Sequence, residues 1–185
     1  MLEQRRRIVI EGTQGFGLSV LHSPYYPFTT SRDTTAASFV SEAGLSPMDV
    51  DDIALVIRAF PIRVGGNSGP LPKEVSWDVI TKESGSPFSI VEYTSVTHRE
   101  RRVARFDSEV VKQAIACNHP TQIVLNHVDY IDAQCAATEL LSTKALKFVR
   151  EVERSVDRTM THIGLGPDII INHETIETLV GGNDG

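Results

Sequence analysis

Residues 11–36, EGTQGFGLSVLHSPYYPFTTSRDTTA, carry the signals from which we predict the fold. They follow the mostly apolar run 7–10, which predicts a short buried strand. The strand leads into a turn with three glycines, and glycine lets the backbone approach a ligand because it has no Cβ and tolerates positive φ. Gln14 lies between these glycines and can both donate and accept hydrogen bonds, which suits a purine edge or a carbonyl group.

The second half of this stretch predicts a place for an anion. Asp33 is a suitable N-cap for a helix that starts near Thr34. Neighbouring hydroxyls, the Arg32 guanidinium and the free N–H groups of a helix start would together suit a phosphate. An ordinary strand, turn and capped helix without a ligand fits the same residues, because a glycine-rich turn alone is a weak signal.

Two motifs in the stretch, EGTQG at 11–15 and YPFTTSRDTTA at 26–36, resemble the central motif of adenylosuccinate synthetases, EGAQG followed by YPYVTSSNTTAG. Members of that family condense IMP with aspartate, driven by GTP and Mg²⁺. The resemblance implies that Gln14 is catalytic and holds the purine edge of IMP. It also implies that Thr30 and Ser31 bind the 5′-phosphate of IMP.

Length and composition are those of one globular domain. The chain has 185 residues, 41% of them hydrophobic and 23% charged. A net charge of −6 makes nucleic acid and anionic membranes poor partners, and we expect neither. No apolar run is long enough to span a bilayer, no signal peptide precedes the first strand, and two cysteines make no disulfide framework. We therefore expect a protein of the reducing cytoplasm.

Strand and helix signals alternate along the chain. Strands are predicted at 7–10, 53–60, 122–126 and 161–163, and helices at 34–43, 77–82, 108–118 and 140–156. Ser46 before Pro47 predicts a further helix start, Asp107 a cap for the third helix, and Trp77 a packing role. This order predicts an α/β fold with a largely parallel sheet flanked by helices, forming a single nucleotide-binding domain over residues 1–180 with a disordered tail at 181–185. The resemblance implies a P-loop-NTPase-like synthetase fold that lacks its N-terminal half.

A long loop is predicted at 59–75, where glycine and proline are frequent and no regular pattern holds. An ordinary surface loop fits this composition. The sequence RVG at 63–65 and GPLPKE at 69–74 resembles the synthetase element RVGxGPFPTEL. That resemblance implies that Val64 contacts the sugar of IMP.

Four arginines fall between residues 99 and 105, after a run of hydroxyl side chains. Such a run is usually a solvated face, but arginine also grips carboxylates and phosphates with two hydrogen bonds. The segment resembles the GATTGRxRR loop with which synthetases clasp aspartate, although Val96 replaces a hydroxyl residue and His98 a glycine. The implied aspartate-binding residues are Ser95, Val96, Thr97, His98, Arg99 and Arg101, with Arg99 also reaching IMP and Arg101 also reaching GTP.

The sequence NHVD at 126–129 follows a predicted strand and resembles the NKxD element that reads guanine. A carboxylate there can accept from the two N–H donors of the guanine edge, which adenine lacks. A strand-end Asp that only caps a turn fits as well. The turn GLGPD at 164–168 resembles the STGPD turn over the base, with glycine in place of serine. The implied GTP-binding residues are Arg101, His127, Val128, Asp129, Gly164, Leu165 and Gly166.

The family's GDEGKGK phosphate loop is absent from the sequence, and the resemblance covers only the family's second half. Six scattered histidines form no ligand pair, so we expect no protein-bound metal, and Mg²⁺ with GTP only if another chain supplies the missing half. Half of such a sheet should leave an uncovered strand edge, so we expect a homo-oligomer or a complex with a chain that bears the phosphate loop.

Three hypotheses follow from these features. The chain is one part of a ligase that joins IMP to aspartate with GTP, completed by a partner. Alternatively, it is a non-catalytic nucleotide-binding, regulatory or interaction subunit derived from that family. The third hypothesis is a related ligase that acts on another purine nucleotide such as dGMP.

Overall fold

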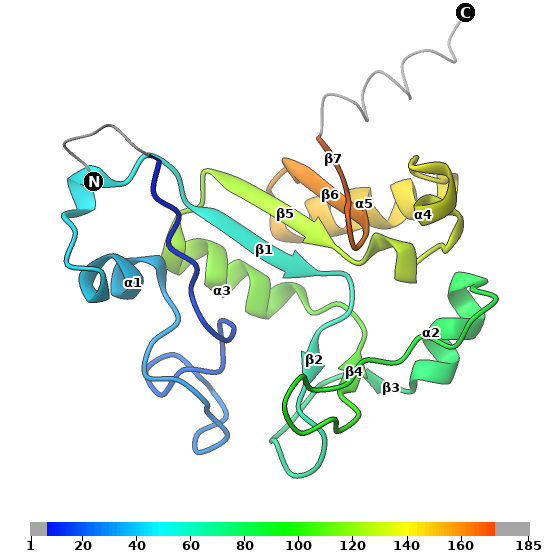
Figure 1. The fold of residues 1–185 in the computed structure, drawn as a ribbon, viewed down its shortest axis with the longest axis horizontal. Helices are drawn as coiled ribbons and strands as arrows, with labels where there is room; N and C mark the ends of the chain where they lie inside the picture. Colours follow the sequence, from blue (N-terminus) through cyan, green and yellow to red (C-terminus); the bar gives the residue numbers. More distant parts are fainter. Residues whose placement is uncertain (1–6, 173–185) are drawn as a thin grey trace, which may run out of the picture.

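The computed structural model of the chain describes residues 7–172. Its main sheet has four strands in the order β1 (Ala54–Arg58), β5 (Gln122–Asn126), β6 (His162–Gly166) and β7 (Ile169–Asn172). The first three are mutually parallel, and β7 pairs with β6 in the antiparallel sense (Figure 1). The prediction of a largely parallel sheet flanked by helices is confirmed. The tail predicted to be disordered, 181–185, lies outside the described residues.

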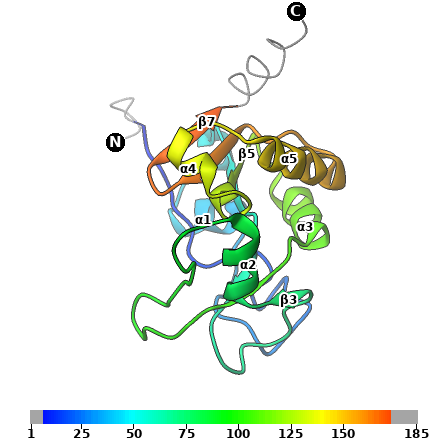
Figure 2. The ribbon, with the colours of Figure 1, turned by 90° about the vertical axis from the view of Figure 1, so that its right-hand side faces the viewer.

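Two helices lie side by side on one face of this sheet, α3 (Ser108–Asn118) and α5 (Thr143–Val156) (Figure 2). Helix α3 has its predicted bounds, and Asp107 caps it as predicted by accepting from the Glu109 amide. Helix α5 begins three residues later than predicted, because the Ser142 side chain caps it by accepting from the Ala145 amide. The apolar stripe of α5 supplies the buried residues Ala145, Val149, Val152 and Val156.

The core lies between the sheet and these helices. Ile123 and Leu125 of β5 and Ile163 and Leu165 of β6 are at most 1% exposed. Strands β5 and β6 are central, because each pairs with a strand on both of its edges. Helices α3 and α5 cover the sheet face on which these apolar side chains lie.

A smaller antiparallel sheet lies below the first one in Figure 1, with the order β2 (Ile62–Arg63), β4 (Arg102–Ala104), β3 (Glu74–Val75). Helix α2 (Trp77–Ser84) packs against it, and Trp77 is buried as predicted. The predicted loop 59–75 therefore contains two short strands, β2 near its start and β3 at its end. Both strands depend on pairing with β4, which lies far along the chain and leaves no local signal.

The strand predicted at 7–10 is wrong. The segment has no strand pairing, and Val9 is 90% exposed. A strand forms when its backbone groups find a neighbouring strand, and no strand of residues 7–172 pairs with this one.

The first helix, α1 (Ala36–Glu42), is shorter than predicted and is capped by Thr35 rather than by Asp33. The 3₁₀ helix η2 (Pro47–Asp49) confirms the predicted start at Ser46, which forms a capping box with Asp49. The 3₁₀ helix η3 (Val128–Tyr130) and helix α4 (Gln134–Thr138) follow β5 and were not predicted. Both cysteines are free, and no helix of the described residues could cross a membrane.

Candidate nucleotide-binding site

The carboxyl ends of β1 and β5 lie next to each other, since Arg58 is in register with Asn126. Ligands of open α/β sheets bind outside this edge, in the loops that follow the strands. Here the loops lead from β1 to the small sheet and from β5 to η3.

The turn after β5 holds its residues by strain and burial. His127 has a left-handed backbone with φ 63°, and its ring lies against Tyr130 with 4.9 Å between centroids. Val128 is fully buried in the core, so its side chain is not free to meet a ligand. We call residues 127–130 the base turn.

Asp129 is the chemically unusual residue of the base turn. Its Oδ1 atom is buried and has no hydrogen-bond partner among the described residues. Burial raises the pKa of Asp129 to about 6, although Arg58 opposes the shift. Burial also lowers the pKa of His127, helped by the charge of Arg58. The turn therefore holds a buried carboxyl oxygen, Oδ1 of Asp129, that has no donor among residues 7–172, and a guanine edge could supply one.

Gly164 in β6 takes the place of the serine in the family motif and lies against Asn126. A Cβ at this position would lie 2.4 Å from the Asn126 side-chain oxygen, so a serine here would require the Asn126 side chain to move. Leu165 is buried in the core, and only its backbone could face a ligand. Gly166 forms part of an irregular pairing with β7. The structure thus brings Gly164 close to Asn126, just before the base turn.

The segment 93–101, which we call the Arg loop, is organised by the buried Thr94. Its hydroxyl contacts that of Thr97 at 2.6 Å and accepts from the Arg99 amide at 3.0 Å. Its amide donates to the Arg99 carbonyl at 2.9 Å. His98 has φ 48°, a conformation that favours glycine, the residue that the family has here. Ser95 and Val96 lie exposed at the tip.

The run of arginines divides into two kinds. Arg102 forms two hydrogen bonds with Glu74, and Arg105 forms two with Glu83. Arg99 has no side-chain partner among residues 7–172, and Arg101 donates only to the Tyr93 carbonyl, at 3.4 Å. Two arginines therefore hold the fold, and the two that the resemblance assigned to ligands have no carboxylate partner within the described part of the chain.

The glycine-rich segment brings together two residues that lie far apart in sequence. The Thr30 hydroxyl donates to the Gln14 side-chain oxygen at 3.1 Å, and Gln14 has φ 64°. Ser31 pairs with Ser19 through a backbone bridge, which aligns the two arms of the segment. The predicted IMP residues Gln14, Thr30 and Ser31 therefore lie on one scaffold.

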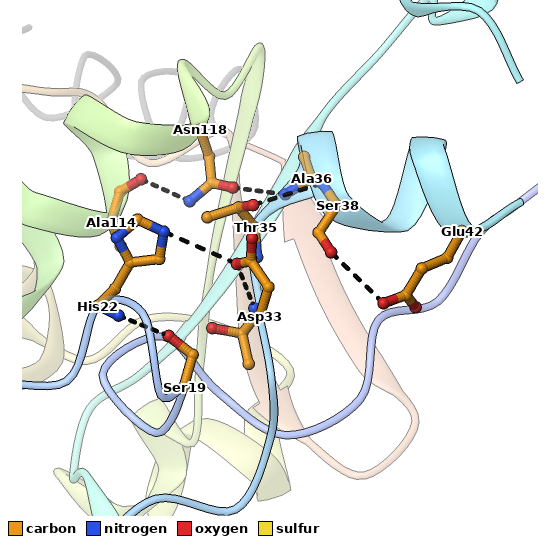
Figure 3. A network of polar contacts seen from close by, with 10 residues as sticks. Ser19, His22, Asp33, Thr35, Ala36, Ser38, Glu42, Ala114 and Asn118 are labelled. Carbon is orange, nitrogen blue, oxygen red and sulfur yellow. Dashed lines mark hydrogen bonds and ion pairs between the residues drawn. The ribbon is translucent and has the colours of Figure 1, made fainter. Parts of the chain in front are cut away.

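The predicted anion site at the helix start is not available in this conformation. The Asp33 carboxylate accepts from the amides of Thr34 and Thr35, and Asn118 of α3 accepts from the Ala36 amide at 2.8 Å (Figure 3). Burial opposes ionisation, but these amides and the Thr35 hydroxyl hold the pKa of Asp33 below its ordinary value. His22 lies 3.8 Å from the same carboxylate. A dianionic phosphate would have to be held by the hydroxyls and Arg32 instead.

The loop with Val64 contacts both the glycine-rich segment and the Arg loop. Arg63 is buried and donates to the Phe28 carbonyl at 2.8 Å and to the Pro70 carbonyl at 3.1 Å. Gly65 lies so close to the Arg loop that a Cβ would be 2.4 Å from the Glu100 carbonyl oxygen. Val64 itself is 41% exposed between these anchors. Sequence reasoning missed the anchoring role of Arg63, although it lies in the RVG motif.

The structure also brings together residues that sequence reasoning did not select, namely Arg58, Glu92 and Tyr130, beside the base turn. No pattern marks them, because they come from three distant segments. By contrast, no hydrogen bond or ion pair within residues 7–172 joins Gln14, Arg99 and Asp129 to one another directly. No group of three acidic, histidine or cysteine side chains in this part of the chain could hold a metal ion.

A largely parallel sheet flanked by helices, with polar loops beyond the carboxyl ends of its strands, defines an α/β protein. The family model described as adenylosuccinate synthetase matches residues 1–136. The chain belongs to the adenylosuccinate synthetase family.

Similar proteins agree with this assignment. Adenylosuccinate synthetase of Methanocaldococcus jannaschii is 40% identical over 179 residues, which is 95% of this chain and 49% of that protein. The Archaeoglobus fulgidus enzyme is 39% identical over 171 residues, 91% of this chain and 48% of its own length. The chain thus spans about half the length of the curated relatives it matches.

Two solved structures resemble the fold. The fully ligated adenylosuccinate synthetase of Plasmodium falciparum has a TM-score of 0.77 and 19% identity, covering 92% of this chain and 51% of that one. The succinoaminodeoxyadenylate synthetase of cyanophage S-2L, bound to dGMP and to dATP as an energy donor, has a TM-score of 0.65 and 31% identity, covering 92% of this chain and 48% of that one. The first likeness shows the fold alone.

Proposed function

We propose that this chain forms the nucleotide- and amino-acid-binding part of a GTP-dependent ligase that joins IMP and aspartate in cytoplasmic purine synthesis. A partner chain would supply the phosphate loop. The observation that carries the proposal is the division of the arginine run. Arg99 and Arg101, on a preformed loop, have no carboxylate partner among residues 7–172, while their neighbours Arg102 and Arg105 are paired. A guanidinium presented in this way suits the carboxylates of an amino acid.

The other roles follow the same residues. Gln14 would hold the purine edge of IMP, since its amide can donate while its oxygen accepts from Thr30. Thr30 and Ser31 would contact the 5′-phosphate, and Val64 the ribose. Thr97 would join Arg99 on the aspartate.

The base turn would select the triphosphate. Asp129 would accept from guanine, and the backbone of 164–166 would close over the base. Mg²⁺ would enter with a triphosphate held by the partner, and we derive no step through it.

A second candidate is a ligase that acts on another purine nucleotide. It is supported by the cyanophage neighbour, which is 31% identical and was solved with dGMP and dATP. The 6-oxo group is common to IMP and dGMP, so Gln14 could hold either one. The 2-amino group of dGMP distinguishes them.

The test is a calorimetric titration of the purified chain with IMP, with aspartate present, and a parallel titration with dGMP. We expect saturable binding that weakens by roughly 10-fold or more in Arg99→Ala, the loss typical of a hydrogen bond to a charged group. Thr30→Ala should weaken IMP binding less. Matched controls are Arg150→Ala on α5 and Thr159→Ala before β6, both exposed and remote, which should bind as the wild type does.

The outcomes separate the three hypotheses. Preference for dGMP over IMP would favour the second candidate. Binding without product after addition of a phosphate-loop chain from a relative would favour a non-catalytic nucleotide-binding subunit. No heat with either nucleotide would overturn the proposal and favour an interaction protein.

A further inference from the structure

Three side chains outside the proposed ligand contacts meet between the base turn and the Arg loop. Arg58, at the end of β1, donates to Oε1 of Glu92, just before the Arg loop. The Tyr130 hydroxyl of η3 donates to the same oxygen at 3.2 Å. The side chains of Arg58 and Glu92 are 27% and 19% exposed, so water screens the ion pair only in part. One carboxylate oxygen therefore joins three separate elements.

The other end of the Arg loop reaches the same tyrosine through Trp77. The indole Nε1 of Trp77 donates to the Arg101 carbonyl at 2.7 Å. The Trp77 ring packs edge to face on the ring of Tyr130, with 6.3 Å between centroids. The Arg101 amide donates to the Glu92 carbonyl at 2.8 Å and closes the neck of the loop. Both ends of the Arg loop are thus fastened to Tyr130.

Tyr130 also belongs to the base turn. Its ring contacts His127, and it directly follows Asp129. Burial and the nearby Glu92 carboxylate raise the pKa of Tyr130, so its hydroxyl keeps the proton that it donates. A displacement of the base turn would therefore move Tyr130 and, through Glu92 and Trp77, both ends of the Arg loop.

We propose that Glu92 and Tyr130 are positioning residues that couple the base turn to the Arg loop, so that order at one promotes order at the other. The inference rests on the proposed function for the identity of the two ligands, a guanine nucleotide and an amino acid. Neither residue would contact a ligand itself. Each would act through Arg99 and Arg101, which the Arg loop carries.

The first test needs no ligand and measures hydrogen exchange of the Arg-loop amides. Tyr130→Phe removes only the hydroxyl, and we expect these amides to exchange roughly 10-fold faster while those of α5 are unchanged. Tyr93→Phe is the matched control, because it makes the same change in the loop itself, at an exposed hydroxyl that has no hydrogen-bond partner among residues 7–172. Arg58→Lys keeps the positive charge and should preserve most of the protection, whereas Arg58→Met should lose it.

Coupling, as opposed to mere support, is tested by changing the base turn and observing the loop. His127→Ala should speed exchange in the Arg loop of the otherwise unaltered chain, and should add little to Tyr130→Phe. Equal effects of His127→Ala in both backgrounds, or unchanged loop exchange in Tyr130→Phe, would overturn the inference.

A third arm uses GDP as the probe. GDP should protect the Arg-loop amides in the wild type and in Tyr93→Phe, but not in Tyr130→Phe. Equal protection in Tyr130→Phe would overturn the coupling. If GDP fails to protect even the base turn of the wild type, the assignment of a guanine nucleotide fails, and the two ligand-free arms still decide the coupling.

Discussion

Two apolar segments, residues 8–10 and β5, carry similar strand signals and have different outcomes. In β5, Ile123 and Leu125 are at most 1% exposed between β1 and β6. In the first segment, Ile8 is 42% and Val9 90% exposed, and no strand of residues 7–172 pairs with it. The comparison teaches that an apolar run marks a segment able to form a strand, while the neighbouring strand decides whether it does.

The regions of the candidate site also differ in how firmly they are attached to the core. The base turn and the Arg loop are tied to the core through Val128, Trp77 and Tyr130. The segment with Gln14 and Thr30 is held by fewer anchors, chiefly Arg63 and Asn118. We therefore expect the base turn and the Arg loop to be preformed, and the segment with Gln14 and Thr30 to depend more on a ligand. Four substitutions test how firmly each region is held.

Leu125→Ala should have the largest effect on stability. The side chain is fully buried in the centre of the sheet, so its removal leaves a cavity and should lower the free energy of unfolding by about 3 kcal/mol. Urea denaturation followed by circular dichroism measures the change. A loss below about 1 kcal/mol would mean that the core repacks easily, and would remove the contrast with the N-terminal segment.

Asp129→Asn should stabilise the protein in a pH-dependent way. The folded pKa of about 6 exceeds the ordinary value of 3.8, so the folded state holds the proton longer and loses stability as the pH rises between these values. The asparagine variant cannot ionise and escapes this loss. The whole pKa shift would correspond to a loss of about 3 kcal/mol in the free energy of unfolding at high pH. We expect about half of that loss, because Asp129 is only half-buried and solvent screens its charge.

The measurement is the difference in unfolding free energy between the Asp129→Asn variant and the wild type at pH 4.5 and at pH 8. The advantage of the variant should be larger at pH 8. An equal difference at both values would show that Asp129 ionises in the fold as it does in the unfolded chain. The same variant should weaken GDP binding if the base turn reads guanine.

Asn118→Ala tests how the N-terminal segment is attached. Asn118 donates to the Ala114 carbonyl and accepts from the Ala36 amide, both at 2.8 Å, and so links α3 to the start of α1 (Figure 3). We expect a loss of about 1 kcal/mol and faster hydrogen exchange confined to α1. Faster exchange throughout β5 as well would mean that the segment and the core unfold as one unit.

Val9→Ala should have the smallest effect. The side chain is almost fully exposed, so its truncation should change the unfolding free energy by less than about 0.5 kcal/mol. It is the counterpart of Leu125→Ala, because both substitutions truncate an apolar side chain, one exposed and one buried. A loss comparable to that of Leu125→Ala would show that residues 8–10 are covered in solution by a strand or a second chain.

Some of the local geometry around the candidate residues could be predicted from the sequence. Gln14 and Thr30 do meet, Asp129 lies in the 3₁₀ helix η3 that follows β5, and His98 has a left-handed backbone conformation that favours glycine. The anion site could not be read correctly, because Asp33 occupies the amides that a phosphate would need. Which arginines are paired was also hidden, since Glu74 and Glu83 lie far from them in sequence.

By itself, the sequence determined the elements whose signals are local. Helix α3 and strand β5 have their predicted bounds, and the caps at Ser46 and Asp107 form as predicted, because capping and apolar periodicity act within a few residues. Three features emerged only from the three-dimensional arrangement: residues 7–10 form no strand, a small sheet forms around β4, and Arg58, Glu92 and Tyr130 meet. Each of these depends on backbone or side-chain partners distant in the chain, and a linear pattern does not record which distant groups come within hydrogen-bonding reach.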